Sequence, residues 1–380
     1  MAASEKMKDL EFLRGIAVLF VMVHHVQNDL VFWNPPRMME FYQYFAGSVG
    51  VDLFFVISGF IIAKTYLASF QVADRQEATG NFILFWYRRA IRLLPAAWFW
   101  LALGVVLNLM FNRSGAFGTL QATVDGALAA VLNIANMRFM DCFAVYECGP
   151  HMIHWTLSLE QQFYFVFPFI AFALGRRLLP VLAIVLFTQF FSETLSAMSG
   201  FRITGFCLGI CLAILTTTWV HAALEPTPIL RSRLLQWLVP LLLFALLGNI
   251  LSAATRMAPT AVRFDIAALV GAMLVFLASY NKAYILPSSP LKSLVVWVGG
   301  RSYSLYLCHF LCYCATREIY FRVAPELART SEGAYVYLTT GLVLTFICGE
   351  LSYRFIEVKF KQAGSRKIDV IKARMAQYHV

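Results

Sequence analysis

Charged residues are scarce in this sequence. Only 14% of its 380 residues are Asp, Glu, Lys or Arg, while 60% are hydrophobic. Soluble domains are about 25% charged and about 45–50% apolar. So little charge excludes a soluble multidomain protein and a soluble nucleic-acid binder, and the abundance of aromatic residues excludes a disordered chain. The composition therefore predicts a polytopic membrane protein.

No cleavable leader, long linker or internal repeat is expected either. The apolar run after Arg14 ends at His24 and His25 without a small-x-small cleavage pattern, so we expect a retained first helix. We expect one membrane domain over residues 1–358 and a basic cytoplasmic tail over residues 359–380.

Apolar runs are plentiful. A membrane-spanning helix needs about 20 mostly apolar residues. Segment 118–137 is less apolar and carries Asp125, so we interpret it as an amphipathic or re-entrant piece. Ten segments qualify as spans: 11–31, 47–68, 91–111, 153–174, 178–192, 201–219, 234–253, 263–280, 302–316 and 335–356. The predicted fold is an all-α bundle of about ten transmembrane helices.

The basic residues indicate orientation. If the N-terminus is cytoplasmic, 19 of the 31 Lys and Arg lie on the cytoplasmic side and nine lie outside, while Arg14, Lys64 and Arg354 fall within spans. Cytoplasmic loops of membrane proteins carry the excess of positive charge. We therefore expect both termini to be cytoplasmic.

Two of the eight cysteines stand apart from the rest. Six occupy apolar runs and are expected to be small packing residues. Cys142 and Cys148 lie in the predicted long outside loop, where they either form a disulfide or stay free. His151 and His154 follow, but the spacing fits no standard zinc finger, so we predict no metal site.

Two ionisable residues of the first span share one face. Arg14 and His25 are eleven residues apart, which corresponds to three helical turns plus 20° and about 16 Å along the axis. They are either an interfacial anchor and a satisfied helix-end residue, or one wall of a polar channel. An imidazole is well suited to general base catalysis near neutral pH.

Three arginines, Arg88, Arg89 and Arg92, are expected at the cytoplasmic start of the third span. Such a cluster either anchors the helix at lipid headgroups or binds a phosphorylated ligand, because a guanidinium matches phosphate with two hydrogen bonds.

The fourth span opens with polar side chains on two of its faces, Thr156, Glu160 and Tyr164 on one and His154, Ser158 and Gln162 on the other. An intramembrane glutamate needs a partner or water, so this end of the span is a candidate functional site. The candidate substrate-binding residues near the outside surface are Asp52, Trp155, Ser158 and Tyr164.

Six motifs that occur in order resemble the acyltransferase-3 family of integral-membrane O-acyltransferases. They cover residues 9 to 357: Arg14-x10-His25, the Gly50–Phe60 stretch, Arg88-Arg89-x2-Arg92-x2-Pro95, Trp155-Thr-Leu-Ser-Leu-Glu160-x2-Phe163-Tyr164, Ser302-Tyr-Ser-Leu-Tyr-x2-His309 and Glu350…Phe355-Ile356-Glu357.

The resemblance implies transfer of an acyl group, usually acetyl, from cytosolic acyl-CoA to a hydroxyl of a surface polysaccharide, a lipopolysaccharide or a lipid-linked glycan. It also implies a bacterial inner-membrane location, and neither a metal nor a nucleic acid is expected to take part. By position, Arg14 and His25 are the family's essential pair and Glu160 is the glutamate of its Trp-Ser-Leu-x2-Glu motif. Arg88, Arg89 and Arg92 correspond to its CoA-side cluster.

Three departures from the family pattern are local. Gln161 stands where a second glutamate is common, Thr156 replaces a serine, and Val358-Lys359 replaces a frequent proline. The C-terminal hydrolase-like domain of many members is not expected here. The alternative function is a transporter or flippase that uses the same polar residues without acyl chemistry. The inverted repeats common in transporters are not evident.

Overall fold

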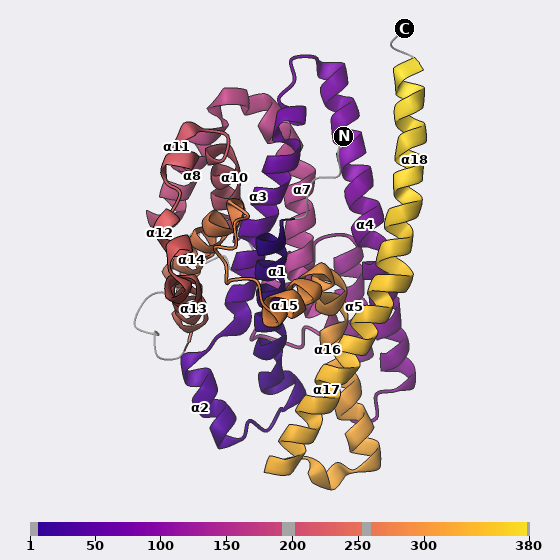
Figure 1. The fold of residues 1–380 in the computed structure, drawn as a ribbon. Helices are drawn as coiled ribbons and strands as arrows, with labels where there is room; N and C mark the ends of the chain where they lie inside the picture. Colours follow the sequence, from indigo (N-terminus) through magenta and orange to yellow (C-terminus); the bar gives the residue numbers. More distant parts are fainter. Residues whose placement is uncertain (1–6, 192–201, 253–259, 378–380) are drawn as a thin grey trace. The chain divides into compact units, whose positions relative to one another are not determined.

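The chain is almost entirely helical in the computed structural model (Figure 1). The structure describes residues 7–191, 202–252 and 260–377, and within these ranges an isolated bridge between Gln27 and Val31 is the only β-type pairing. The chain forms two compact units. Unit 1 comprises Met1–Thr65, Arg176–Tyr303 and Ala324–Leu338, and unit 2 comprises Tyr66–Gly175, Ser304–Val323 and Thr339–Val380.

Unit 1 is built around the first helix. Its helices are α1 (Lys8–His25), α2 (Pro36–Tyr44), most of α3 (Gly50–Phe70), α8 (Leu178–Phe191), α10 (Thr204–Leu215), α11 (Trp219–Ala223), α12 (Thr227–Arg231), α13 (Arg233–Ile250), α14 (Thr260–Ser279), α15 (Pro290–Gly300) and the start of α17 (Ser331–Ser352). Short helical turns lie at Val26–Leu30, Gly47–Val49 and Pro325–Leu327. α1 packs along α15 (Figure 1).

Small residues and one buried ion pair hold unit 1 together. At Gly59 of α3 an added methyl group would meet the carbonyl of Phe206, and at Gly209 of α10 it would meet the carbonyl of Val56, so both positions require glycine for the two helices to approach. Lys292 Nζ of α15 lies 2.6 Å from Asp9 Oδ1, and both side chains are buried. These contacts fix the position of α1, which carries Arg14 and His25.

Unit 2 contains the longest helix of the described chain. Its elements are α4 (Arg75–Met110), α5 (Leu120–Val131), α6 (Ala135–Cys142), the turn Pro150–Ile153, α7 (His154–Leu174), most of α16 (Ser302–Val323), the end of α17, the turn Tyr353–Glu357 and α18 (Val358–Gln377). α18 runs beside α4 (Figure 1), and Gly364 lies against the side chain of Ile91. Trp100 Nε1 of α4 donates to Ser352 Oγ of α17 at 3.1 Å.

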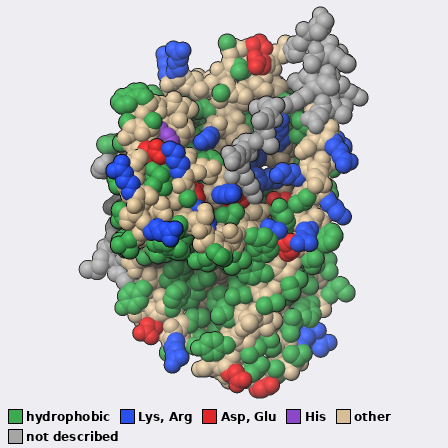
Figure 2. Space-filling model, viewed as in Figure 1, with side chains coloured by type: hydrophobic (Ala, Val, Ile, Leu, Met, Phe, Trp, Pro, Cys, Tyr) green, Lys and Arg blue, Asp and Glu red, His purple; other side chains and the backbone are tan. Residues whose placement is uncertain are grey.

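Six helical segments of the described chain are long and apolar enough to cross a membrane. They are Gly47–Phe70, Arg75–Met110, Pro150–Phe190, Arg233–Ile250, Val262–Ser279 and Ser331–Ile368. A seventh is added if Thr204–Leu215 and Trp219–Arg231, which meet at 89°, form one broken span. Hydrophobic side chains cover much of the surface shown in Figure 2, as contact with lipid requires. These features are those of a membrane-embedded helical protein.

Two helix boundaries differ from the sequence expectation. α1 ends at His25 rather than near residue 31, because Gln27 is extended and Asn28 has φ 69°. α4 begins at Arg75, where the side chain of Asp74 caps the helix by accepting from Glu77 N at 2.8 Å, so the three arginines lie inside the helix and not at its start. α5 has 12 residues and is about 18 Å long, too short to span a bilayer, which agrees with the expectation that segment 118–137 is not a span.

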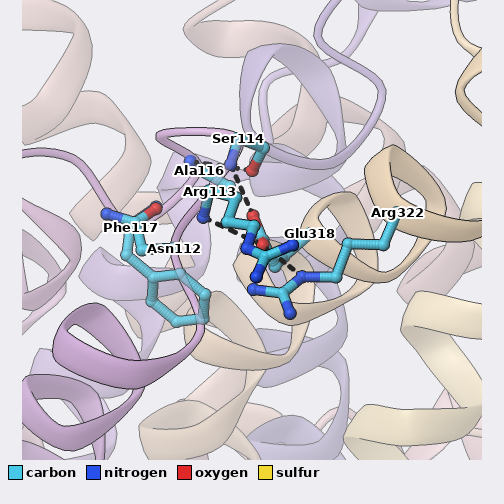
Figure 3. Close-up of polar contacts among 7 residues, drawn as sticks. All are labelled: Asn112, Arg113, Ser114, Ala116, Phe117, Glu318 and Arg322. Atoms are coloured by element: carbon cyan, nitrogen blue, oxygen red, sulfur yellow. Dashed lines mark hydrogen bonds and ion pairs between the residues drawn. The ribbon is translucent and has the colours of Figure 1, made fainter.

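The loop between α4 and α5 is fastened to α16 by one carboxylate (Figure 3). Glu318 is fully buried and accepts hydrogen bonds from Arg113 N at 2.9 Å and Ser114 N at 2.7 Å, while Arg322 Nε lies 2.6 Å away. Burial raises the pKa of Glu318, but the hydrogen bonds from Ser114, Arg113 and Arg322 outweigh it and lower that pKa to about 2. Glu318 is therefore ionised at neutral pH and holds the loop.

Candidate functional site

His25 and Asp29 form a hydrogen-bonded pair at the end of α1. His25 Nδ1 lies 2.8 Å from Asp29 Oδ2, and the two side chains are 16% and 25% exposed. The turn that ends α1 returns Asp29 to the imidazole of the last helical residue. A carboxylate that accepts from Nδ1–H orients the ring and leaves Nε2 as the basic nitrogen. This geometry is that of a histidine prepared for proton transfer or nucleophilic attack.

Asp29 is not among the site residues predicted from the sequence. Its spacing of four residues from His25 could have indicated it, because this spacing places both on one side of a helix or of a helix-ending turn. Glu160 belongs to unit 2, whereas His25 and Asp29 both belong to unit 1. Within unit 1 Asp29 occupies the orienting position.

Arg14 has a carboxylate neighbour on its own helix. Its guanidinium Nη1 lies 3.3 Å from Glu11 Oε1, and both side chains are mostly buried. Arg14 and His25 both belong to the regular part of α1, so the predicted shared face and the separation of about 16 Å hold. Arg14 is thus a partly shielded cation on the face of α1 that ends at His25.

Arg88, Arg89 and Arg92 project from α4 within a 100° arc. In the part of the chain that the structure describes, none of them forms a hydrogen bond or an ion pair with a protein group, and Arg92 Nε is buried without a partner. The adjacent helix α18 adds Lys359, Lys361, Arg366 and Lys367. Arg88, Arg89 and Arg92, which have no carboxylate partner among the described residues, form the kind of positive cluster that binds an anionic ligand.

Arg89 is connected to Glu160 through an aromatic ring. The guanidinium carbon of Arg89 lies 4.8 Å from the ring centre of Tyr164, and the Tyr164 hydroxyl donates to Glu160 Oε1. Trp86 Nε1 donates to the carbonyl of Tyr164 at 3.1 Å. A cavity of about 540 Å³ lies beside this chain, lined by Trp86, Arg89, Tyr164 and Phe165 among others. The cluster and the glutamate thus lie on facing helices α4 and α7 of unit 2.

Two further candidates of α7 pack against neighbouring elements. Ser158 Oγ accepts from Ala135 N at 3.2 Å, and the Trp155 ring stacks on Phe139 with centres 5.4 Å apart. Both contacts join the start of α7 to α6, so these two side chains help to hold the two helices together.

Asp52 has a buried partner that the sequence did not reveal. Arg202 Nε donates to Asp52 Oδ1 at 3.0 Å, and its Nη2 donates to Asp52 Oδ2. The guanidinium also lies 3.7 Å from the ring centre of Phe264. A carboxylate held by a two-point ion pair on two elements of unit 1 is well suited to stabilising the bundle.

Cys142 and Cys148 form a disulfide, which decides between the two possibilities left open by the sequence. Their sulfurs are therefore not available as zinc ligands beside His151 and His154. Among the described residues, no group of three or more His, Cys, Asp or Glu is arranged to hold a metal ion.

Comparison with known proteins identifies the relatives of this chain. Residues 7–353 match the family model described as "Acyltransferase domain". The chain is 24% identical over 391 residues to O-acetyltransferase OatA of Staphylococcus aureus strain MRSA252, covering 97% of this chain and 59% of that protein. It is 26% identical over 408 residues to the putative O-acetyltransferase SAR0937 of the same strain, covering 98% and 60%.

A third relative, the putative O-acetyltransferase SAS0844 of Staphylococcus aureus strain MSSA476, is 27% identical over 399 residues, covering 96% of this chain and 58% of that protein. The chain thus spans about three fifths of the length of these relatives. No solved structure matches it.

Proposed function

The chain belongs to the acyltransferase-3 family, and we propose on this premise that it transfers an acetyl group from acetyl-CoA to a hydroxyl of an extracytoplasmic or lipid-linked glycan. The observation that carries the proposal is the His25–Asp29 pair. The names of the relatives support acetyl as the acyl group. Membrane lipids are the surroundings in which the reaction takes place.

In the proposed step, Nε2 of His25 removes the proton of the acceptor hydroxyl. The resulting oxygen nucleophile attacks the thioester carbonyl, the carbon–sulfur bond breaks, and the CoA thiolate takes the proton from the imidazolium. The products are the acetylated glycan and free CoA. A variant of this route has His25 Nε2 attack the thioester first and pass the acetyl group to the hydroxyl afterwards.

Asp29 holds the imidazole through Nδ1 in either route and balances the charge of the imidazolium. Arg14 is proposed to act as a cation near the thioester oxygen, and Glu160 is proposed as a further catalytic carboxylate. Binding of the acceptor glycan is proposed to involve four further residues, which act by positioning the helices that carry them: Asp52, Trp155, Ser158 and Tyr164.

The CoA phosphates are proposed to bind Arg88, Arg89 and Arg92. Guanidinium groups recognise phosphate with paired hydrogen bonds, and none of these three is neutralised by a carboxylate among the described residues. The basic residues of α18 add to the positive potential there. The apolar cavity beside Arg89 and Trp86 offers room for the uncharged arm of the same ligand.

The number of spans and the orientation of the termini are proposed from the helix lengths and from the distribution of Lys and Arg. About ten spans are proposed: the six long apolar segments with α7 and α8 treated separately, the bent pair that begins with α10, α1, and residues 302–316 of α16. Both termini are placed in the cytoplasm, with residues 359–380 as a basic segment after the membrane domain of residues 1–358. The proposed location is the bacterial inner membrane.

The test is acetyl transfer from radiolabelled acetyl-CoA into envelope glycan by the full chain in membranes. His25→Ala is expected to lower transfer by about 100-fold or more while leaving the amount of inserted protein unchanged. His221→Ala, which alters a histidine remote from the pair in sequence, serves as the matched control. Transfer at the wild-type rate by the His25 variant would overturn the proposal and favour a transporter that carries out no acyl chemistry.

The same assay distinguishes arginines that bind acetyl-CoA from arginines that only anchor α4 at the membrane surface. Arg89→Ala is expected to raise the apparent KM for acetyl-CoA by about tenfold and to change the KM for glycan less, because the variant loses a charge-assisted hydrogen bond to phosphate. An unchanged KM for acetyl-CoA would assign these arginines to membrane anchoring alone.

A further inference from the structure

A second cavity lies in unit 1, immediately after the turn that holds Asp29. It has a volume of about 480 Å³ and is lined by residues 32–36, which follow α1, and by residues 329–331, which precede α17. Pockets of this size accommodate small-molecule ligands. None of the steps described above uses this cavity.

The cavity is connected to the catalytic pair by a hydrogen bond. Asn34 Nδ2 donates to Asn28 Oδ1 at 2.6 Å, and Asn28 directly precedes Asp29. Both asparagines have positive φ, 46° and 69°, which Asn tolerates better than most residues. The segment between His25 and the cavity is therefore held in one defined conformation.

The lining combines aromatic rings with polar groups. Phe32 is 38% exposed, and Trp33 is fixed edge-on against the buried ring of Tyr337, with centres 5.0 Å apart. Trp33 Nε1 and Asn34 Oδ1 are buried and have no hydrogen-bond partner in the described part of the chain. One donor and one acceptor are thus left unsatisfied at the aromatic wall.

The opposite wall supplies a cation and hydroxyl groups. Arg329 is exposed and forms no hydrogen bond or ion pair within the described ranges, and Thr330 and Ser331 lie beside it. A lipid chain would favour a wholly apolar lining. A pyranose has apolar C–H faces that pack on aromatic rings and a rim of hydroxyl groups that bind amide, hydroxyl and guanidinium groups.

We propose that this cavity is the subsite that holds a pyranose unit of the acceptor glycan. The inference rests on the proposed acyl transfer and identifies where the acceptor binds. Phe32 and Trp33 provide the stacking face, and Asn34 and Arg329 bind the hydroxyl groups. The Asn34–Asn28 hydrogen bond ties the bound sugar to the turn that orients His25.

The experiment compares apparent KM values for envelope glycan and for acetyl-CoA, using the full chain in lipid nanodiscs. Arg329→Gln and Phe32→Ala are each expected to raise the KM for glycan about tenfold and well beyond any change in the KM for acetyl-CoA. Arg37→Gln and Phe41→Ala alter an arginine and an exposed phenylalanine of α2 that do not line the cavity, and they are expected to keep both wild-type values.

Equal increases in both KM values, or an unchanged KM for glycan in the two cavity variants, would overturn the subsite. A second measurement does not depend on catalysis: binding of fluorescently labelled envelope glycan to the His25→Ala chain in nanodiscs. Adding Arg329→Gln is expected to weaken this binding about tenfold, and equal affinities would overturn the subsite. A glycan that binds this cavity but is never acetylated would instead refute the proposed function.

Discussion

The imidazole of His25 meets a carboxylate because α1 stops at that residue. The left-handed backbone of Asn28 ends the helix and returns Asp29 to Nδ1 at 2.8 Å. A histidine whose Nδ1–H is accepted by a carboxylate presents its other nitrogen as a base without further reorganisation. At this scale the proposed function depends on the backbone turn of residues 26–30.

Asp29→Asn is expected to lower kcat for acetyl transfer by about 100-fold with little change in the KM for acetyl-CoA, because the amide neither balances an imidazolium nor fixes the tautomer. Steady-state kinetics of the full chain in nanodiscs measures both constants. Asp29→Glu, which keeps the carboxylate, is expected to recover part of kcat. A wild-type kcat in Asp29→Asn would remove Asp29 from the mechanism.

Helix α16 and the loop after α4 are joined through a single buried carboxylate. Two backbone N–H groups of the loop and the guanidinium of Arg322 converge on Glu318 (Figure 3). Arg322 also lies 4.4 Å from the ring centre of Phe111 at the end of α4. The loop geometry is thus determined by an element about 200 residues later in the chain.

Glu318→Gln is expected to lower the free energy of unfolding by about 1–3 kcal/mol at neutral pH, because a charged acceptor of three hydrogen bonds is replaced by a neutral one. The pKa of Glu318 is lowered to about 2 from its ordinary 4.5. The stabilisation is therefore complete above about pH 4.5 and is lost as the pH falls through about 2.

Thermal unfolding of wild type and Glu318→Gln, measured from pH 7 to pH 2, checks this expectation. The difference in Tm is expected to shrink below pH 4.5. Glu326→Gln, which alters an exposed glutamate of the turn after α16, is the matched control and is expected to show no such difference. A Tm difference that stays constant down to pH 2 would contradict the ionised state of Glu318.

At the scale of the whole molecule, the charge asymmetry is the basis for the proposed orientation. An excess of Lys and Arg on one side of the proposed spans leads us to expect both termini in the cytoplasm. The Cys142–Cys148 disulfide agrees with an oxidising location for the loop after α6. An even number of spans satisfies both observations.

Reporter fusions test this orientation. Green fluorescent protein fused after Val380 is expected to fluoresce in the cytoplasm, and alkaline phosphatase fused after Val145 is expected to be active outside. Exchanging the two reporters provides the control, since each is expected to be silent on the opposite side. An active phosphatase at Val380 would require an odd number of spans.

Much of this protein could be predicted from local sequence patterns. Apolar runs of about 20 residues predicted the six helical segments that are long and apolar enough to cross a membrane, while the predicted total of ten stays a prediction. The 3.6-residue repeat placed Arg14 and His25 on one face. Glu350 and Arg354, four residues apart, form an ion pair of the kind that this spacing favours. Each of these features depends on residues close together in the chain.

The tertiary structure alone decided the partners that come from distant segments. Arg202 reaches Asp52 across 150 residues, Arg113 and Ser114 meet Glu318 across about 200, and residues 329–331 complete a cavity begun at residue 32. Composition and helical repeat specify which face of a helix is buried, but not which other helix covers it. That choice depends on the packing of all helices in a unit, and it is there that buried charges find their partners.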